Sequence, residues 1–413
     1  MSRTENKKPK FFYGYIVVVA GFIVLVILNG TLYSFGVFLK PLAAEFGWTR
    51  AMTAGAYSMF MFLCGFLYII SGRLNDRFGP RVVMTASGFC LGLGYLLMSR
   101  ISAIWQLYLF FGVIAAIGHS GGFVPLTSTI ARWFVRRRGL MTGLVVSGIG
   151  IGTIIMPPIA TRLILNYGWR TSYFIMGIVA LVVIIIAAQF LRRDPGQIDQ
   201  LPYGVSEAKQ DNLIAEARGL SLREAIHTRQ FWMLCVLFLS HGVGQQAVIV
   251  HIAPHATDLG ISTILAANIL SIIGGLSIAG RVGMGSASDR IGIKSTLIIG
   301  LTLLSVALFW LVVAKELWML YSSAILFGVG YGAMMALMSP IVAELFGLRA
   351  HGTILGVASF AMMIGGGTGP LMAGQIFDIT GSYQLGFLLS AVLSVIALVM
   401  ASLLRSTRRE GLV

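Results

Sequence analysis

The chain has 413 residues, of which 57% are hydrophobic and only 11% are charged. Soluble domains carry about 25% charged residues, so the composition excludes a soluble globular protein and indicates one embedded in a membrane. Fifty glycines agree with this, because small residues let membrane helices pack closely. A net charge of +15 would suit a nucleic-acid partner. In a membrane protein, however, basic residues more often reflect which loops face the cytoplasm, so we examine that explanation first.

Twelve apolar stretches are long enough to cross a bilayer, which takes about 20 residues of helix. Such long runs exclude a membrane β-barrel, so each stretch is predicted to be a helix. In chain order they cover residues 13–38, 50–72, 80–100, 103–132, 138–163, 168–191, 229–254, 261–287, 293–314, 316–345, 351–377 and 382–404.

Lysine and arginine sort by membrane side if both termini are cytoplasmic. The inner segments then hold 23 of the 30 basic residues and the outer segments hold 6. This sorting disfavours nucleic-acid binding and predicts a multi-pass protein in contact with lipid. The one basic residue left over is Arg281, which lies inside a predicted span.

The two halves of the chain repeat each other at an offset of 213 residues. EFGWT at 45–49 matches DLGIS at 258–262, and GRLNDRFGPR at 72–81 matches GSASDRIGIK at 285–294. The sequence therefore predicts an all-α integral membrane protein with two pseudo-symmetric six-helix bundles, 13–193 and 229–405. Parallel repeats of this kind are typical of transporters that rock around a midplane site.

The remaining segments are predicted to be cytoplasmic: an N-terminal tail at 1–12, a linker at 194–228 and a C-terminal tail at 406–413. Within the linker, Ser221 with Glu224 three residues later predicts a capping box for a short helix. A merely solvated stretch is the alternative.

Three motifs resemble a known family. The loop that holds Asp76-Arg77, with its second copy at Asp289-Arg290, resembles the signature of the major facilitator superfamily. WFVRRRGLMTGLVVSGIGIG at 133–152 resembles the helix 4–5 signature of its monocarboxylate transporter family. YGYIVVVAGF at 13–22 is similar to that family's helix 1 opening but lacks its usual acidic residue.

The resemblance covers essentially the whole chain, and bacterial oxalate/formate antiporters share much of the pattern. It implies a transporter for a small monocarboxylate such as lactate, driven by a proton, in the cytoplasmic membrane of a bacterium. It also implies no enzymatic activity and no cofactor, and we expect the protein to work as a monomer.

The two loop motifs are candidates for a gate. Asp76, Arg77, Asp289 and Arg290 lie at predicted helix ends beside basic loops, where they could form a charge latch that closes the inner side. Topology and helix capping alone are the alternative. The basic run 136–138 could hold anionic lipid, or it could serve only to fix the orientation.

Arg281 precedes Asp289 by eight residues, which is ~12 Å along a helix. An arginine at such a depth costs about 2.5–3.5 kcal/mol on insertion scales, and it does not lose its proton. A buried carboxylate partner or snorkelling to the inner face would explain it, but no carboxylate falls clearly in mid-membrane. Because a guanidinium binds a carboxylate through two parallel hydrogen bonds, Arg281 predicts an anionic substrate.

Other polar residues in the spans are candidates for the same site. His119 and Tyr331 are related by a local offset of 212 and fall near the middle of their helices, and Tyr68 occupies the position equivalent to Arg281. The full set of predicted substrate-binding residues is Arg281, Tyr331, His119, Asn29, Tyr33, Ser277 and Tyr68. Each could instead be a packing residue.

The residues that would bind the proton differ from the family pattern. In many members of the family an aspartate precedes the helix 8 arginine by four residues, whereas this chain has Ser277, and Tyr33 stands where animal members carry a lysine. Asp258 and His251 are the predicted substitutes, because histidine titrates near neutral pH and a buried carboxyl group can do so. A solvated outer loop is the alternative.

The function predicted from these residues is proton symport of a small monocarboxylate anion. Exchange of one carboxylate for another is the nearest alternative, since it needs Arg281 but no titrating group. A membrane ligand sensor is a third, disfavoured because the chain carries no sizeable soluble output domain. We find no cluster of metal ligands and no catalytic constellation in the spans.

Overall fold

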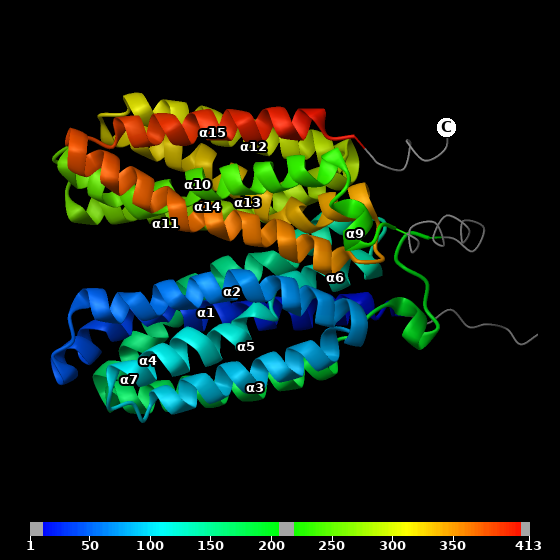
Figure 1. Cartoon of the computed structure of the whole chain (residues 1–413), viewed down its shortest axis with the longest axis horizontal. Helices are drawn as coiled ribbons and strands as arrows, with labels where there is room; N and C mark the ends of the chain where they lie inside the picture. The colour runs from blue at the N-terminus through cyan, green and yellow to red at the C-terminus, as the bar shows by residue number, and fades with distance from the viewer. Residues whose placement is uncertain (1–10, 206–218, 406–413) are drawn as a thin grey trace, which may run out of the picture.

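The protein is an all-helical molecule of two bundles that lie side by side (Figure 1). The computed structural model describes residues 11–205 and 219–405, apart from the side chains of residues 50, 51, 54 and 263. The N-terminal half contains α1 (Gly14–Phe46), α2 (Arg50–Phe78), α3 (Pro80–Met98), α4 (Ile104–Leu107), η1 (Tyr108–Ala115), α5 (Ala116–Ser120), α6 (Phe123–Trp133) and α7 (Arg138–Gln189).

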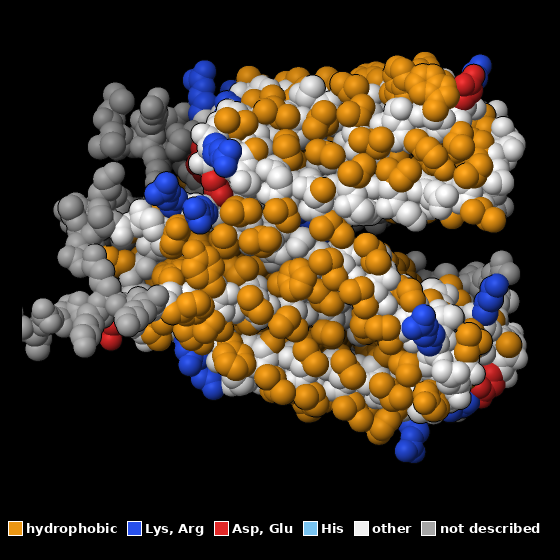
Figure 2. All heavy atoms as spheres, turned by 180° about the vertical axis from the view of Figure 1, so that it is seen from behind, with side chains coloured by type: hydrophobic (Ala, Val, Ile, Leu, Met, Phe, Trp, Pro, Cys, Tyr) orange, Lys and Arg blue, Asp and Glu red, His pale blue; other side chains and the backbone are white. Residues whose placement is uncertain are grey.

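The C-terminal half contains α10 (Arg229–Asp258), α11 (Thr263–Ile291), α12 (Ile293–Val313), α13 (Leu317–Phe346), α14 (His351–Thr380) and α15 (Gln384–Leu403). The short 3-10 helix η2 (Pro195–Ile198) and helix α9 (Leu222–Ala225) lie between the halves in the chain. Apolar side chains cover the middle of both halves, and lysine and arginine lie toward their two ends (Figure 2).

The twelve predicted crossings are confirmed within the described residues. Eleven helices there are long and apolar enough to span a membrane, and the longest, α7, has 52 residues. Gly168 interrupts α7 with φ 77° and ψ 163°, a conformation that glycine tolerates and other residues rarely adopt. Helix α7 therefore makes two crossings, the fifth and the sixth.

The fourth crossing is more irregular than the sequence pattern predicts. It starts as α4, continues through the π-helical turns of η1 and α5, stops at Gly121 and Gly122, and resumes as α6. A Cβ atom on Gly121 would collide with the Ser87 hydroxyl, and one on Gly122 would collide with Leu28. The break is thus held by close packing against α3 and α1, which hydrophobicity alone does not reveal.

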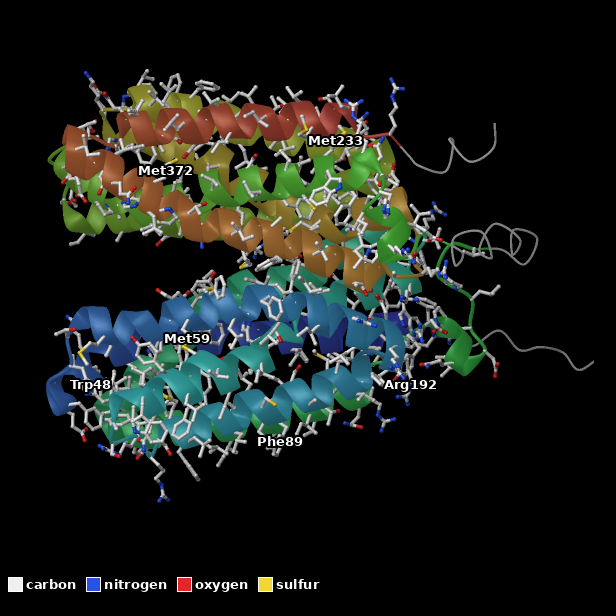
Figure 3. All side chains as sticks on the ribbon, viewed as in Figure 1. Trp48, Met59, Phe89, Arg192, Met233 and Met372 are labelled. Atoms are coloured by element: carbon white, nitrogen blue, oxygen red, sulfur yellow. The ribbon has the colours of Figure 1, made fainter. Side chains whose placement is uncertain are left out.

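The two halves touch at one end and part at the other. We call these the linker end, where η2, α9 and Arg192 lie, and the far end, where Trp48 lies (Figure 3). At the linker end, Gly72 faces the backbone of Gly352, and Gly143 faces the Arg281 carbonyl, with no room for a side chain. Figure 2 shows the halves separated by a gap toward the far end.

The predicted capping box at the start of α9 is confirmed. The Ser221 N–H donates to Glu224 Oε2 at 2.6 Å, and the Glu224 N–H donates to Ser221 Oγ at 3.3 Å. The Ser221 N–H is the main reason that the pKa of the Glu224 carboxyl lies below its ordinary value. The rest of the linker prediction falls partly on residues 206–218, which lie outside the described residues.

We predict that Gly72→Ala destabilises the contact between the halves. The added Cβ would press on the Gly352 carbonyl, a backbone group that cannot rotate away, and overpacking of this kind costs about 1–3 kcal/mol. Thermal unfolding of the purified protein in detergent should shift to lower temperature. Gly36→Ala is the matched control, because no heavy atom lies within 4 Å of a Cβ at that position; equal shifts in both variants would contradict the packing described here.

Candidate functional site

A cavity of about 110 Å³ lies between the two halves, with walls from both of them. Most of its lining is apolar, and methionine is prominent in it at positions 61, 335, 338, 362 and 363. Nine of the twenty lining residues carry a polar group, and in small-molecule sites such groups fix the orientation of the ligand. They are Asn29, Tyr33, Cys64, Tyr68, His119, Gln245, Gln246, Tyr331 and Ser359.

Five of the predicted binding residues line this cavity: Asn29, Tyr33, Tyr68, His119 and Tyr331. The first four come from the N-terminal half and Tyr331 comes from α13 in the C-terminal half. The side-chain nitrogen of Asn29 donates to the Leu25 carbonyl at 3.1 Å. Tyr33 also lines the cavity, and 42% of its surface is exposed.

Arg281 lies on α11 beside Tyr331 and is not itself among the residues that line the cavity. Its guanidinium carbon is 5.3 Å from the centroid of the Tyr331 ring, and the residue is only 1% exposed. Its Nε and Nη1 atoms are buried and have no hydrogen-bond partner. Within the described residues the side chain forms no ion pair, so neither a protein carboxylate nor snorkelling accounts for this charge.

Gly150 on α7 makes room for the guanidinium. A Cβ at this position would lie 2.9 Å from Arg281 Nη1 and 2.6 Å from Ile278 Cγ1. The absence of a side chain at Gly150, within the glycine-rich run at 148–152, therefore leaves space for the charged side chain. The phenol of Tyr33 lies within electrostatic range of both Arg281 and Tyr331.

His119 lies at the end of α5, directly before the break in the fourth crossing. Its Nδ1 is 3.4 Å from Cys64 Sγ, and its ring packs edge-on against Phe60 at 5.4 Å. Its Nε2 is buried without a partner. The helix break thus positions a histidine with one free ring nitrogen on the cavity wall.

Ser277 and the predicted proton-binding residues are placed differently. Ser277 is buried one turn from Arg281, but its hydroxyl donates to the Gly274 carbonyl at 2.8 Å, and it is not among the residues that line the cavity. His251 Nε2 bonds the Pro370 carbonyl at 2.9 Å, and its ring lies 5.0 Å from that of Tyr383. Asp258 is the exposed last residue of α10, at the far end.

The two motif aspartates bridge the halves at the linker end. Asp76 on α2 accepts hydrogen bonds from the backbone N–H groups of Gly352 (3.1 Å) and Thr353 (2.8 Å), at the start of α14. Asp289 on α11 accepts from those of Gly139 and Leu140, both at 2.9 Å, at the start of α7. Each aspartate thus binds a helix N-terminus in the opposite half, where the helix dipole favours negative charge.

The basic partners in this latch are not those expected from the motifs. Arg132 on α6 pairs with Asp76 at 3.1 Å and donates to the Leu348 carbonyl at 2.8 Å, so it joins both halves. Arg77 instead lies 5.1 Å from the ring of Phe78. In the part of the chain that the structure describes, neither Arg77 nor Arg290 forms an ion pair.

Some residues that line the cavity are not predicted from the sequence. Gln245 and Gln246 line the cavity from α10. Two adjacent glutamines in an otherwise apolar helix are the sequence feature that could have indicated them. Gln245 also lies one turn from His241, and Gln245 Oε1 and His241 Nε2 are both buried without a partner. The lining methionines cannot be predicted from the sequence, because a methionine in a membrane helix is indistinguishable there from any other apolar packing residue.

The comparisons with known proteins agree with the fold. The family model described as Major Facilitator Superfamily matches residues 19–286 and 278–412. Monocarboxylate transporter 13 of Rattus norvegicus is 27% identical over 390 residues, which are 94% of this chain and 87% of that protein. The uncharacterized MFS-type transporter YhjX of Escherichia coli is 26% identical, with 81% of this chain and 82% of that protein covered.

Solved structures show the same architecture at lower sequence identity. The proton:xylose symporter XylE superposes with a TM-score of 0.78 at 15% identity, covering 96% of each chain. The human organic anion transporter MFSD10 superposes with a TM-score of 0.72 at 16% identity, covering 95% of this chain and all of the other. With twelve crossings in two halves around a shared cavity, the chain belongs to the Major Facilitator Superfamily of transporters, and its relatives there include proteins named monocarboxylate transporters.

Proposed function

We propose that this transporter moves a small monocarboxylate such as lactate across the membrane together with a proton, by alternating access. The observation that carries the proposal is Arg281, a buried permanent cation with unpartnered nitrogens beside the cavity between the halves. A carboxylate that enters the cavity would supply the missing negative charge and the missing hydrogen-bond acceptors. A guanidinium offers a planar fork that fits a carboxylate in two-point contact.

The polar cavity residues support recognition of the rest of the substrate. Tyr331 and Tyr33 contribute hydroxyl groups to the cavity lining, and His119 contributes a ring nitrogen without a partner. The remaining lining is apolar and rich in methionine, whose flexible side chain adapts to small differences in shape. One charged end and one apolar end are the features of a short monocarboxylate.

The latch at the linker end supports alternating access. In this state Asp76 and Asp289 hold the halves together there, while the far end is open. Opening toward the linker end would require both aspartates to release the helix N-termini that they bind. We therefore assign Asp76 and Asp289 to the gate, with Arg132 as the partner of Asp76.

A proton would make the loaded transporter electrically neutral at the substrate. We propose Asp258 and His251 as the groups that receive it, because they lie near the far end, which is open to solution in this state. Carboxylate exchange without a proton is the second candidate. It is favoured by the position of Asp258 and His251 outside the cavity lining. Among the described residues, Arg281 is then the charged group next to the lining residue Tyr331.

The remaining assignments follow from the charge pattern. We propose that the protein lies in the cytoplasmic membrane of a bacterium as a monomer, with both termini and the linker end on the cytoplasmic side. The concentration of lysine and arginine in the predicted inner segments supports this orientation.

We predict that Arg281→Lys lowers lactate uptake about 10-fold or more, because the charge stays but the two-point contact is lost. The measurement is uptake of radiolabelled lactate into proteoliposomes. Arg290→Lys, an exposed residue on the same helix, should leave the initial rate unchanged. Full activity of the Arg281→Lys variant would rule out two-point binding at this residue.

We predict that an inward proton gradient accelerates lactate uptake, and that Asp258→Asn removes the acceleration while leaving exchange of internal for external lactate intact. Proteoliposomes with the interior more alkaline than the medium provide the test. If the gradient has no effect and internal lactate alone accelerates uptake, the protein is an exchanger and the proton assignment is wrong.

We predict that Asp289→Asn loosens the linker end. The amide keeps the shape but loses the charge that favours the start of α7, an interaction worth about 0.3–2 kcal/mol. Spin labels at Leu74→Cys and Ile291→Cys, both exposed near this end, should report a new population at longer distance once the three native cysteines are replaced. Asp378→Asn, an exposed residue at the far end, is the control; an unchanged distance distribution in Asp289→Asn would contradict the latch.

A further inference from the structure

An apolar groove runs along the outside of the N-terminal half, on the opposite side of α1 from the substrate cavity lining. It has a volume of about 450 Å³ and is formed by the linker-end half of α1 and the last turns of α7. Ala20 and Ala187 are buried at its floor, whereas Val19, Ile186 and Phe190 are 48–57% exposed along its walls. Small residues at the floor and large exposed ones at the walls create a trough that faces hydrocarbon.

The groove ends in a polar cluster at the linker end. Tyr15 belongs to the groove lining, and its ring lies 6.2 Å from that of Tyr203 and 6.0 Å from that of Phe134. The Arg137 guanidinium carbon lies 5.7 Å from the Tyr203 ring centroid and interacts electrostatically with the Tyr15 phenol. Two phenols and one guanidinium therefore meet at the linker end of the apolar groove.

The backbone fixes this cluster in place. The Tyr203 N–H donates to the Trp133 carbonyl at 2.9 Å, and the Tyr203 carbonyl accepts from the N–H groups of Val135 (3.2 Å) and Arg136 (3.0 Å). This bridge attaches the start of the linker to the loop before α7. Tyr203 is thereby held as part of a built surface.

Arg137 itself adopts an unusual conformation. Its φ of 65° is left-handed, which is uncommon for residues other than glycine, asparagine and aspartate. Its side chain is exposed and forms no ion pair within the described residues. Asp289 interacts with it electrostatically, but both oxygens of that carboxylate already bind the N–H groups of Gly139 and Leu140.

We propose that this groove binds one anionic phospholipid, with an acyl chain in the trough and the phosphate at Arg137, Tyr15 and Tyr203. A lipid satisfies both features at once, because its chain matches a wall that faces hydrocarbon and its head matches a cation at the membrane surface. Anionic lipids of the inner leaflet attract basic side chains at about 1 kcal/mol for each residue near the surface. The neighbouring Arg136 is exposed but has no ring contact, so the site depends on Arg137 in particular.

Native mass spectrometry of the full-length protein in neutral detergent tests the proposal. We expect one phosphatidylglycerol to remain bound, and phosphatidylcholine with the same chains to bind more weakly. Arg137→Asn keeps a residue that tolerates the left-handed backbone and should lower the phosphatidylglycerol affinity about fivefold, the equivalent of one surface charge. Arg136→Asn is the matched control and should have little effect.

A second variant separates the chain from the head. Ala187→Leu fills the floor of the groove without a change in charge and should also weaken phosphatidylglycerol binding. Equal binding of phosphatidylcholine, equal losses in Arg136→Asn and Arg137→Asn, or displacement of the lipid by glycerol phosphate alone would overturn the proposal. A lipid-free dimer in the same spectra, lost in Ala187→Leu, would assign the groove to a second copy of the chain instead.

Discussion

A permanent positive charge inside the membrane is the constraint to which the rest of the site responds. Arg281 is almost fully buried, it does not release its proton, and within the described residues no carboxylate neutralises it. Its surroundings make room for the charge without cancelling it, through Gly150 on one side and the face of Tyr331 on the other. A site of this kind is incomplete until an anion arrives, and this is the physical reason that we propose Arg281 as a substrate-binding residue.

A second interaction that organises the structure is helix capping between the halves, in which an aspartate of each half binds a helix N-terminus of the other. Residues 76 and 289 correspond at the repeat offset of 213, and so do the helix starts that they bind, 139 with 352 and 140 with 353. Each half thus supplies the anion for the N-terminus of a helix in the other. The backbone groups at a helix start have no partner within the helix. The contacts at the linker end satisfy these groups, and under the proposed alternating access an opening of this end would expose them to water or lipid headgroups.

The sequence predicts much of this because membrane helices and repeats leave strong one-dimensional signals. Twelve crossings follow from apolar length alone, and Arg281 stands out because the charge sorting leaves it unaccounted for. The helix break at Gly121 and Gly122 depends on the side chains that pack against it. Two adjacent glycines in a glycine-rich chain are not enough to predict it. The partner of Asp76 is not predictable from the sequence either. Arg132 is one of several basic residues in the predicted inner segments, and only the fold places α6 beside α2. Spacing along the chain locates helix ends, but only the fold decides which ends meet.

Our central proposal is that Arg281 binds the transported anion. A crystal structure of the protein with 2-bromopropionate, a lactate-sized monocarboxylate whose bromine can be located by anomalous diffraction, tests it most directly. The account predicts a bromine peak within the cavity and a carboxylate within hydrogen-bond distance of two nitrogens of Arg281. A peak elsewhere, or an Arg281 side chain bonded to protein groups with the ligand out of reach, would contradict it.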